Sequence, residues 1–180
     1  MTTDAASDAT ESTTPPPPVC IVASRYNARI TDAMTRDAER IYVQRGGDAD
    51  APGVIDAAGT FELPALCGAA ARSGLYRGVV AIGCVVRGET EHDRYIASAV
   101  STALAELSAM TGVPIAFGVL TVNTPDQAIE RANTKGAEAM HALLDSVAGI
   151  DALSEARRDD HPGVRFALAP STDKTAAGGA

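Results

Sequence analysis

Tryptophan is absent from this 180-residue sequence, and aromatic residues make up only 4% of it. Because the hydrophobic fraction is still 46%, alanine and branched aliphatic residues must fill most of any core. Basic residues are also few: 15 Lys and Arg stand against 23 Asp and Glu, giving a net charge of −8. That balance, without a basic stripe, argues against a nucleic-acid-binding protein. No apolar run reaches the length of a membrane span, so we expect no membrane partner.

Cysteine is scarce as well. The three cysteines, Cys20, Cys67 and Cys84, lie in apolar segments and lack the spacing of a metal site. An odd number in that context predicts buried free thiols in a reducing compartment and no bound metal. The first residues contain no apolar signal-peptide core, so we expect a cytoplasmic protein.

The composition divides the chain into three parts. Residues 1–18 are mostly Thr, Ser, Asp and Ala closed by four prolines, which predicts a disordered acidic arm. Residues 19–158 carry periodic apolar patterns and predict one folded domain. Residues 159–180 lose this periodicity and predict a second disordered tail, in which Val164–Leu168 is apolar enough to dock on the domain.

Strand and helix patterns alternate along the domain. Apolar runs without polar alternation predict buried strands at 19–23, 79–86 and 114–122, and a weaker strand candidate lies at 54–55. Helical spacing follows each strand, with glycine stops at Gly46–Gly47, Gly74 and Gly112. Thr124–Gln127 has the pattern of a capped helix start, and the last helix is expected over roughly 136–147. Right-handed crossovers then predict a three-layer α/β/α sandwich with a mostly parallel four-stranded sheet.

The junction after the third strand is the most informative segment. There Arg87–His92 reads Arg-Gly-Glu-Thr-Glu-His and leads into a helix. In open α/β sheets, ligands bind outside the carboxyl ends of the strands, and a helix N-terminus offers free N–H groups to an anion. His92 is therefore a candidate proton-transfer residue beside an anion-binding turn. A surface or capping histidine is the alternative.

Three other segments are ambiguous when each is taken alone. Tyr26 follows the first strand and either stacks on a planar ligand or covers the sheet edge. Phe61 and Glu62 either wall a pocket or, for the glutamate, place a favourable charge in the first turn of a helix. Arg131 and Lys135 are four residues apart and suit phosphate capture if the helix continues, whereas a Glu130/Arg131 surface pair is the alternative.

Taken in order, these segments resemble the 6,7-dimethyl-8-ribityllumazine synthase family over about residues 19–148. Five blocks carry the resemblance: Tyr26–Asn27, Gly59–Pro64, Gly83–His92, Phe117–Thr121 and Gln127–Ala132. The resemblance implies a flavodoxin-like fold and a transferase of riboflavin biosynthesis. Such an enzyme condenses 5-amino-6-(D-ribitylamino)uracil with 3,4-dihydroxy-2-butanone 4-phosphate and releases 6,7-dimethyl-8-ribityllumazine, phosphate and water. The resemblance implies no metal and no organic cofactor.

The resemblance also implies roles for individual residues. His92 moves protons, and the substrate phosphate lies on the amides of Glu89 and Thr90 with Arg131 as counter-charge. The pyrimidine and ribityl chain meet six residues: Tyr26, Phe61, Glu62, Val85, Val86 and Phe117. Phe117 and Arg131 come from the neighbouring subunit. The implied assembly is a homo-oligomer built from pentamers, up to an icosahedral shell, with riboflavin synthase as an associated protein.

Three departures from the family pattern bear on function. Tyr26 stands where Phe or Trp is more usual, and Asp93–Arg94 stand where the family commonly has an aromatic residue and an acid. The segment after Arg131 is short, so Lys135 is either the family's pocket lysine or a structural lysine beside Gly136. The departures keep one alternative open, a non-catalytic paralogue that binds lumazine or flavin or forms a shell.

Overall fold

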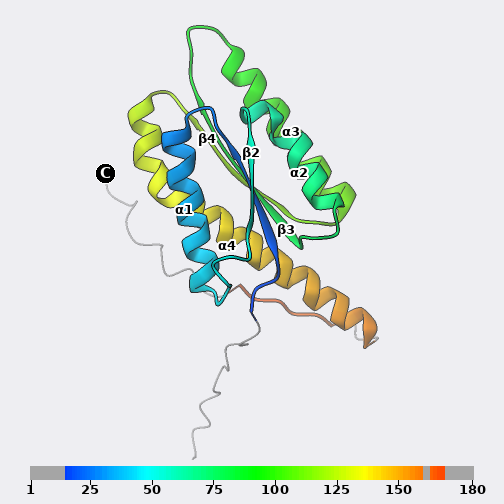
Figure 1. Ribbon diagram of the computed structural model, residues 1–180. Helices are drawn as coiled ribbons and strands as arrows, with labels where there is room; N and C mark the ends of the chain where they lie inside the picture. Colours follow the sequence, from blue (N-terminus) through cyan, green and yellow to red (C-terminus); the bar gives the residue numbers. More distant parts are fainter. Residues whose placement is uncertain (1–14, 160–162, 169–180) are drawn as a thin grey trace, which may run out of the picture.

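The computed structural model describes residues 15–159 and 163–168 (Figure 1). The disorder expected for residues 1–14, 160–162 and 169–180 lies outside the described residues. No helix in the described part of the chain is long and apolar enough to cross a membrane.

Four strands and four helices alternate along the described residues. They are β1 (Val19–Ser24), α1 (Ala28–Gln44), β2 (Gly53–Ala57), α2 (Leu63–Arg72), β3 (Gly78–Val86), α3 (His92–Thr111), β4 (Ile115–Val122) and α4 (Pro125–Arg158), with a short 3₁₀ turn, η1 (Thr60–Glu62), before α2. All pairings are parallel and the strand order is β2-β1-β3-β4. The predicted parallel sheet is therefore confirmed.

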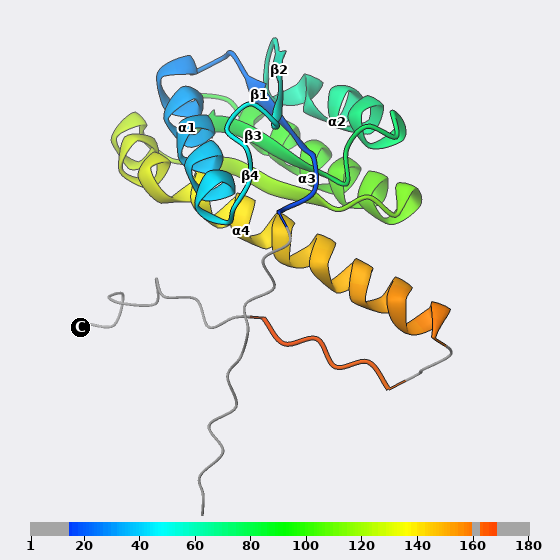
Figure 2. The ribbon, with the colours of Figure 1, turned by 60° about the horizontal axis from the view of Figure 1, so that its bottom comes forward.

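Two helices cover each face of the sheet, which confirms the three-layer sandwich (Figure 2). Successive strand residues point to opposite faces. Ile21 and Ile82 accordingly pack with α1 and α4, whereas Val22 and Ala81 pack with α2 and α3. Alanine, valine, isoleucine and leucine supply most of both cores, as the scarcity of aromatic residues requires.

Helix α4 differs from the sequence expectation. The pattern predicted a helix start at Thr124 and a last helix over roughly 136–147, but the structure has one continuous helix of 34 residues. Thr124 caps it by accepting a hydrogen bond from the Gln127 N–H (3.3 Å). Gly136 does not begin a helix; it lies where α4 touches α1, and a Cβ there would overlap the carbonyl oxygen of Met34. This glycine allows two helices to approach closely.

The three cysteines are free and buried, as predicted. Each lies on a strand or helix of the core, Cys20 on β1, Cys67 on α2 and Cys84 on β3. Burial raises the pKa of Cys20 and Cys84 to about 11 and that of Cys67 to about 12. At neutral pH these thiols are protonated and unreactive.

Part of the C-terminal segment returns to the domain. Residues 163–168 form neither helix nor strand and run beside the end of α4 (Figure 2). The Phe166 ring lies 3.6 Å from the position that a Cβ on Gly149 would occupy. The apolar Val164–Leu168 stretch therefore contacts α4 through its aromatic residue.

Candidate functional site

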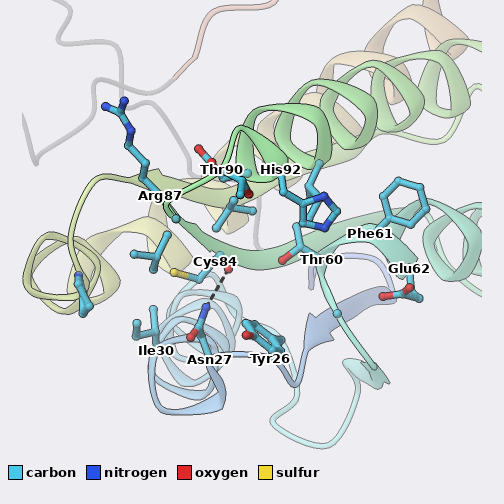
Figure 3. Close-up of a pocket in the computed structure, with 17 residues that line it drawn as sticks. Tyr26, Asn27, Ile30, Thr60, Phe61, Glu62, Cys84, Arg87, Thr90 and His92 are labelled. Atoms are coloured by element: carbon cyan, nitrogen blue, oxygen red, sulfur yellow. Dashed lines mark hydrogen bonds between the residues drawn. The ribbon is translucent and has the colours of Figure 1, made fainter.

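A pocket of about 640 Å³ opens at the carboxyl ends of the strands. The segments that follow β1, β2 and β3 form its walls, and the first turn of α3 closes one side (Figure 3). This is the place at which open parallel sheets bind ligands.

The first wall is the short loop between β1 and α1. Tyr26 projects from it with 72% of its surface exposed, and its side chain lies on the pocket side next to Asn27 (Figure 3). Hydrogen bonds hold the loop: the Ser24 hydroxyl donates to the Tyr26 carbonyl (3.3 Å) and the Thr31 hydroxyl to the Ser24 carbonyl (2.7 Å). An exposed ring on a well-tethered loop suits stacking on a flat ligand.

The second wall is η1. Thr60 is buried against β3 because Gly83 has no side chain: a Cβ there would lie 3.0 Å from the methyl group of Thr60. With Thr60 anchored, the next two residues, Phe61 and Glu62, project into solvent at the pocket. The sequence block Gly59–Pro64 is therefore a short turn whose buried residue holds two exposed ones in place.

The third wall begins at the end of β3 and runs into α3. Val85 and Val86 line the pocket, and the Arg87 N–H donates to the Val122 carbonyl (2.9 Å), so β3 stays paired with β4 up to the turn. His92 is the first residue of α3, and its exposed ring lies near Thr60 and Phe61 (Figure 3). The predicted histidine at a helix start is thus confirmed in position.

Acidic residues flank this turn but do not all face the pocket. Glu91 forms an ion pair with Arg94 on its own helix (2.9 Å), and neither Glu89 nor Glu91 lines the cavity. Its lining includes three charged side chains, Glu62, Arg87 and Asp93, and one histidine, His92. The pocket formed by one chain therefore offers little net positive charge to a phosphate.

Seven of the expected site residues meet in this pocket: Tyr26, Phe61, Glu62, Val85, Val86, Thr90 and His92. Four others do not. Glu89 belongs to the adjoining turn, Phe117 lies 40% exposed on the edge strand β4, and Arg131 is exposed on α4. Lys135, also on α4, forms an ion pair with Glu138 (3.3 Å). The alternative, a Glu130/Arg131 surface pair, is not among the ion pairs of the described residues.

Sequence reasoning gave no pocket role to three residues that line it, Asn27, Thr60 and Ile96, and it singled out Asp93 only as a departure from the family pattern. Ile96 had a usable signal, since it lies one helical turn after His92 and on the same face. Thr60 and Asn27 stand in two of the blocks that carry the resemblance, but no local pattern gives their side chains a role, because their positions depend on contacts with β3 that are distant in sequence.

No group of three or more His, Cys, Asp or Glu that could hold a metal ion is present among the residues that the structure describes. The pocket is instead lined by an exposed aromatic pair, aliphatic strand ends, a turn before a helix N-terminus and a histidine. These features define an α/β sandwich protein with a small-molecule site at the ends of its strands.

Comparison with known proteins gives the family. The family model for 6,7-dimethyl-8-ribityllumazine synthase matches residues 17–150. The chain is 38% identical over 144 residues to 6,7-dimethyl-8-ribityllumazine synthase 1 of Caulobacter vibrioides, covering 78% of this chain and 94% of that protein. It is 38% identical over 133 residues to the synthase of Nautilia profundicola, covering 72% of this chain and 86% of that protein. The chain therefore belongs to the 6,7-dimethyl-8-ribityllumazine synthase family, the transferases of riboflavin biosynthesis.

Proposed function

We propose that this enzyme condenses 5-amino-6-(D-ribitylamino)uracil with 3,4-dihydroxy-2-butanone 4-phosphate. The products are 6,7-dimethyl-8-ribityllumazine, phosphate and water. The observation that carries the proposal is the meeting, in one pocket, of seven residues to which the family resemblance gives roles, although they come from three separate segments of the chain. The amine and the ketone are reactive on their own, so positioning supplies much of the acceleration.

The pyrimidine lies between the first and second walls in this proposal. The Tyr26 ring stacks on it, and the Tyr26 hydroxyl adds a polar group that the more usual phenylalanine lacks. Phe61 and Glu62 border it from η1, where both side chains are exposed at the pocket. Val85 and Val86 form the surface beneath the ribityl chain.

The butanone phosphate lies at the third wall. The turn before α3 places the amides of Glu89 and Thr90 at the N-terminus of a 20-residue helix, which favours an anion. His92 is the first residue of the same helix and transfers protons during imine formation and phosphate elimination. The leaving phosphate also requires a positive counter-charge.

We propose that a second chain supplies that charge. Arg131 lies on α4 and Phe117 on the edge strand β4; both are exposed and neither lines the pocket of its own chain. In a ring of identical subunits, each chain would present these two residues to the pocket of its neighbour. The proposed assembly is a homo-oligomer built from pentamers, up to an icosahedral shell.

Two further parts of the proposal concern the setting of the enzyme. Three buried, unpaired cysteines suit a reducing compartment, so we place the enzyme in the cytoplasm. Its product is a lumazine, so association with riboflavin synthase would pass the product on directly.

Product analysis tests the proposed reaction. Purified protein is incubated with both substrates, and lumazine is identified by mass and fluorescence while released phosphate is measured. We expect equal amounts of the two products, formed faster than in a protein-free control. Lumazine formation at the rate of the protein-free control, together with tight binding of added lumazine, would instead support the non-catalytic paralogue.

A further inference from the structure

Asn27 has an unusual backbone conformation at the edge of the pocket. Its φ of 65° and ψ of 38° place it in the left-handed region, and it is the only non-glycine residue with positive φ in residues 15–159 and 163–168. Asparagine tolerates this region better than most residues, but glycine would do so without strain. Backbone geometry alone therefore does not explain why an asparagine side chain stands here.

The side chain is not used to cap the helix that it precedes. Asn27 is the N-cap residue of α1, a position where asparagine commonly accepts a hydrogen bond from the first turn. No such side-chain bond exists; the Asn27 backbone carbonyl accepts from the N–H groups of Ile30 (2.9 Å) and Thr31 (3.2 Å) instead. The amide group is left available for another contact.

That contact is with β3. The Asn27 Nδ2 group donates to the carbonyl oxygen of Cys84 at 3.1 Å, across 57 positions of sequence (Figure 3). Pairing between β1 and β3 has ended by this point, since its last residue pair is Ala23 with Ile82. The asparagine amide thus takes the place of a strand N–H and extends the connection between the two strand ends.

Tyr26 lies between two anchored neighbours as a result. On one side the Arg25 N–H donates to the Ala57 carbonyl at the end of β2 (2.7 Å). On the other side Asn27 is tied to Cys84 at the end of β3. The Asn27 side chain is the anchor toward β3, the strand whose end carries Val85 and Val86 at the pocket.

We propose that Asn27 is a positioning residue that sets the Tyr26 ring over the pocket by tying the first loop to the Cys84 carbonyl. The inference rests on the proposed function, because it assigns the pyrimidine to the Tyr26 side of the site. It predicts that loss of the amide weakens use of the pyrimidine substrate and leaves use of the butanone phosphate unchanged.

Two substitutions separate the side chain from the backbone. Asn27→Gly keeps the left-handed conformation and removes the hydrogen bond, whereas Asn27→Asp keeps the size and replaces the donor by a carboxylate that the Cys84 carbonyl repels. We expect both to raise the KM for 5-amino-6-(D-ribitylamino)uracil by about three- to tenfold, the range of one hydrogen bond. The KM for the butanone phosphate and kcat should change by less than a factor of about two, within the scatter of distant substitutions.

A double-mutant cycle with Tyr26→Ala shows whether Asn27 acts through the ring. In the Tyr26→Ala background, Asn27→Gly should raise the pyrimidine KM no further. An equal effect in both backgrounds, or a lowered melting temperature with unchanged KM values, would overturn the positioning role while wild-type turnover still supports the proposed function. Wild-type protein that makes no lumazine would overturn the proposed function and this inference together.

Discussion

His92 joins the two halves of the proposed chemistry, because it begins the helix at which we propose the phosphate binds, and its ring lies beside η1, the proposed pyrimidine wall (Figure 3). Replacing it with glutamine keeps a polar side chain of similar reach but removes proton transfer near neutral pH. We expect His92→Gln to lower kcat by about 10- to 1000-fold without abolishing turnover, since the reactants also condense unaided.

The structure provides a matched control for this variant. His141 lies on α4, away from the pocket, and its Nδ1 atom contacts the Arg45 guanidinium (3.3 Å). Steady-state assays should give His141→Gln a kcat like that of the wild type. If His92→Gln matched the wild type across the pH range, His92 would have no part in the mechanism.

Buried thiols predict a pH dependence of stability. Burial raises the pKa of Cys67 to about 12, whereas an unfolded thiol ionises near pH ~8.5. The native state therefore holds the neutral thiol, and its stabilising effect is complete below pH ~8.5 and is lost as pH rises toward 12. Between pH 8.5 and 10.5, wild-type protein should lose roughly 2 kcal/mol more unfolding free energy than Cys67→Ala.

Urea titrations at several pH values measure this difference. The comparison uses the change with pH and not the absolute stability, because the substitution also removes buried volume. Tyr42, whose pKa is likewise raised by burial, contributes equally to both proteins. Parallel curves for the two proteins would show that Cys67 ionises as readily in the native state as in the unfolded chain.

Individual site residues were predictable from the sequence only where their position after a predicted strand placed them at the edge of the sheet. Tyr26, Phe61 and His92 each stand in the segment that follows a strand, so the parallel sheet brings them to one edge, and all three line the same pocket. The role of the Asn27 amide depends on the Cys84 carbonyl, 57 positions away, and no local pattern reports such a bond.

Among the elements, α1 and α4 approach closely at Gly136. Asp37 of α1 supports this contact by accepting a hydrogen bond from the Ala137 N–H of α4 (2.8 Å). A methyl group at Gly136 would overlap the Met34 carbonyl, so Gly136→Ala must move one helix. We expect a loss of about 1–3 kcal/mol in unfolding free energy, as for other overpacked sites.

Gly149 is the control on the same helix. A Cβ there would meet only the Phe166 ring, at an ordinary 3.6 Å, so Gly149→Ala should be neutral or stabilise by up to ~1 kcal/mol through helix propensity. Urea unfolding of both variants gives the comparison. Equal stabilities would mean that the approach of α1 to α4 at Gly136 is not tight.

Gly136 also explains why the bounds of the last helix were predicted wrongly. Apolar runs and glycine stops predicted the strands and the first three helices within a few residues, because both signals are local. Gly136 has the same local appearance as a helix boundary, but its reason for being glycine lies on α1. Gly136 is therefore explained by the packing of α4 on α1 and does not mark a helix boundary, and α4 continues from Pro125 to Arg158.

At the scale of the whole molecule, one chain carries an incomplete version of the proposed site. Tyr26 and His92 line the pocket, while Phe117 and Arg131 are exposed elsewhere on the surface. The sequence alone could not separate these sets, because order along the chain does not say which residues face a neighbour. We accordingly expect an oligomer in sedimentation, with activity confined to the assembled form.

Mixing two impaired variants tests most directly whether lumazine forms at a site shared by two chains. One variant carries Tyr26→Ala with His92→Gln; the other carries Arg131→Ala, which should lose about 1.5–3 kcal/mol of phosphate interaction. Under conditions of subunit exchange, some interfaces combine two intact halves. We expect lumazine fluorescence then to rise well above that of either variant alone, whereas no recovery despite demonstrated exchange would contradict the shared site.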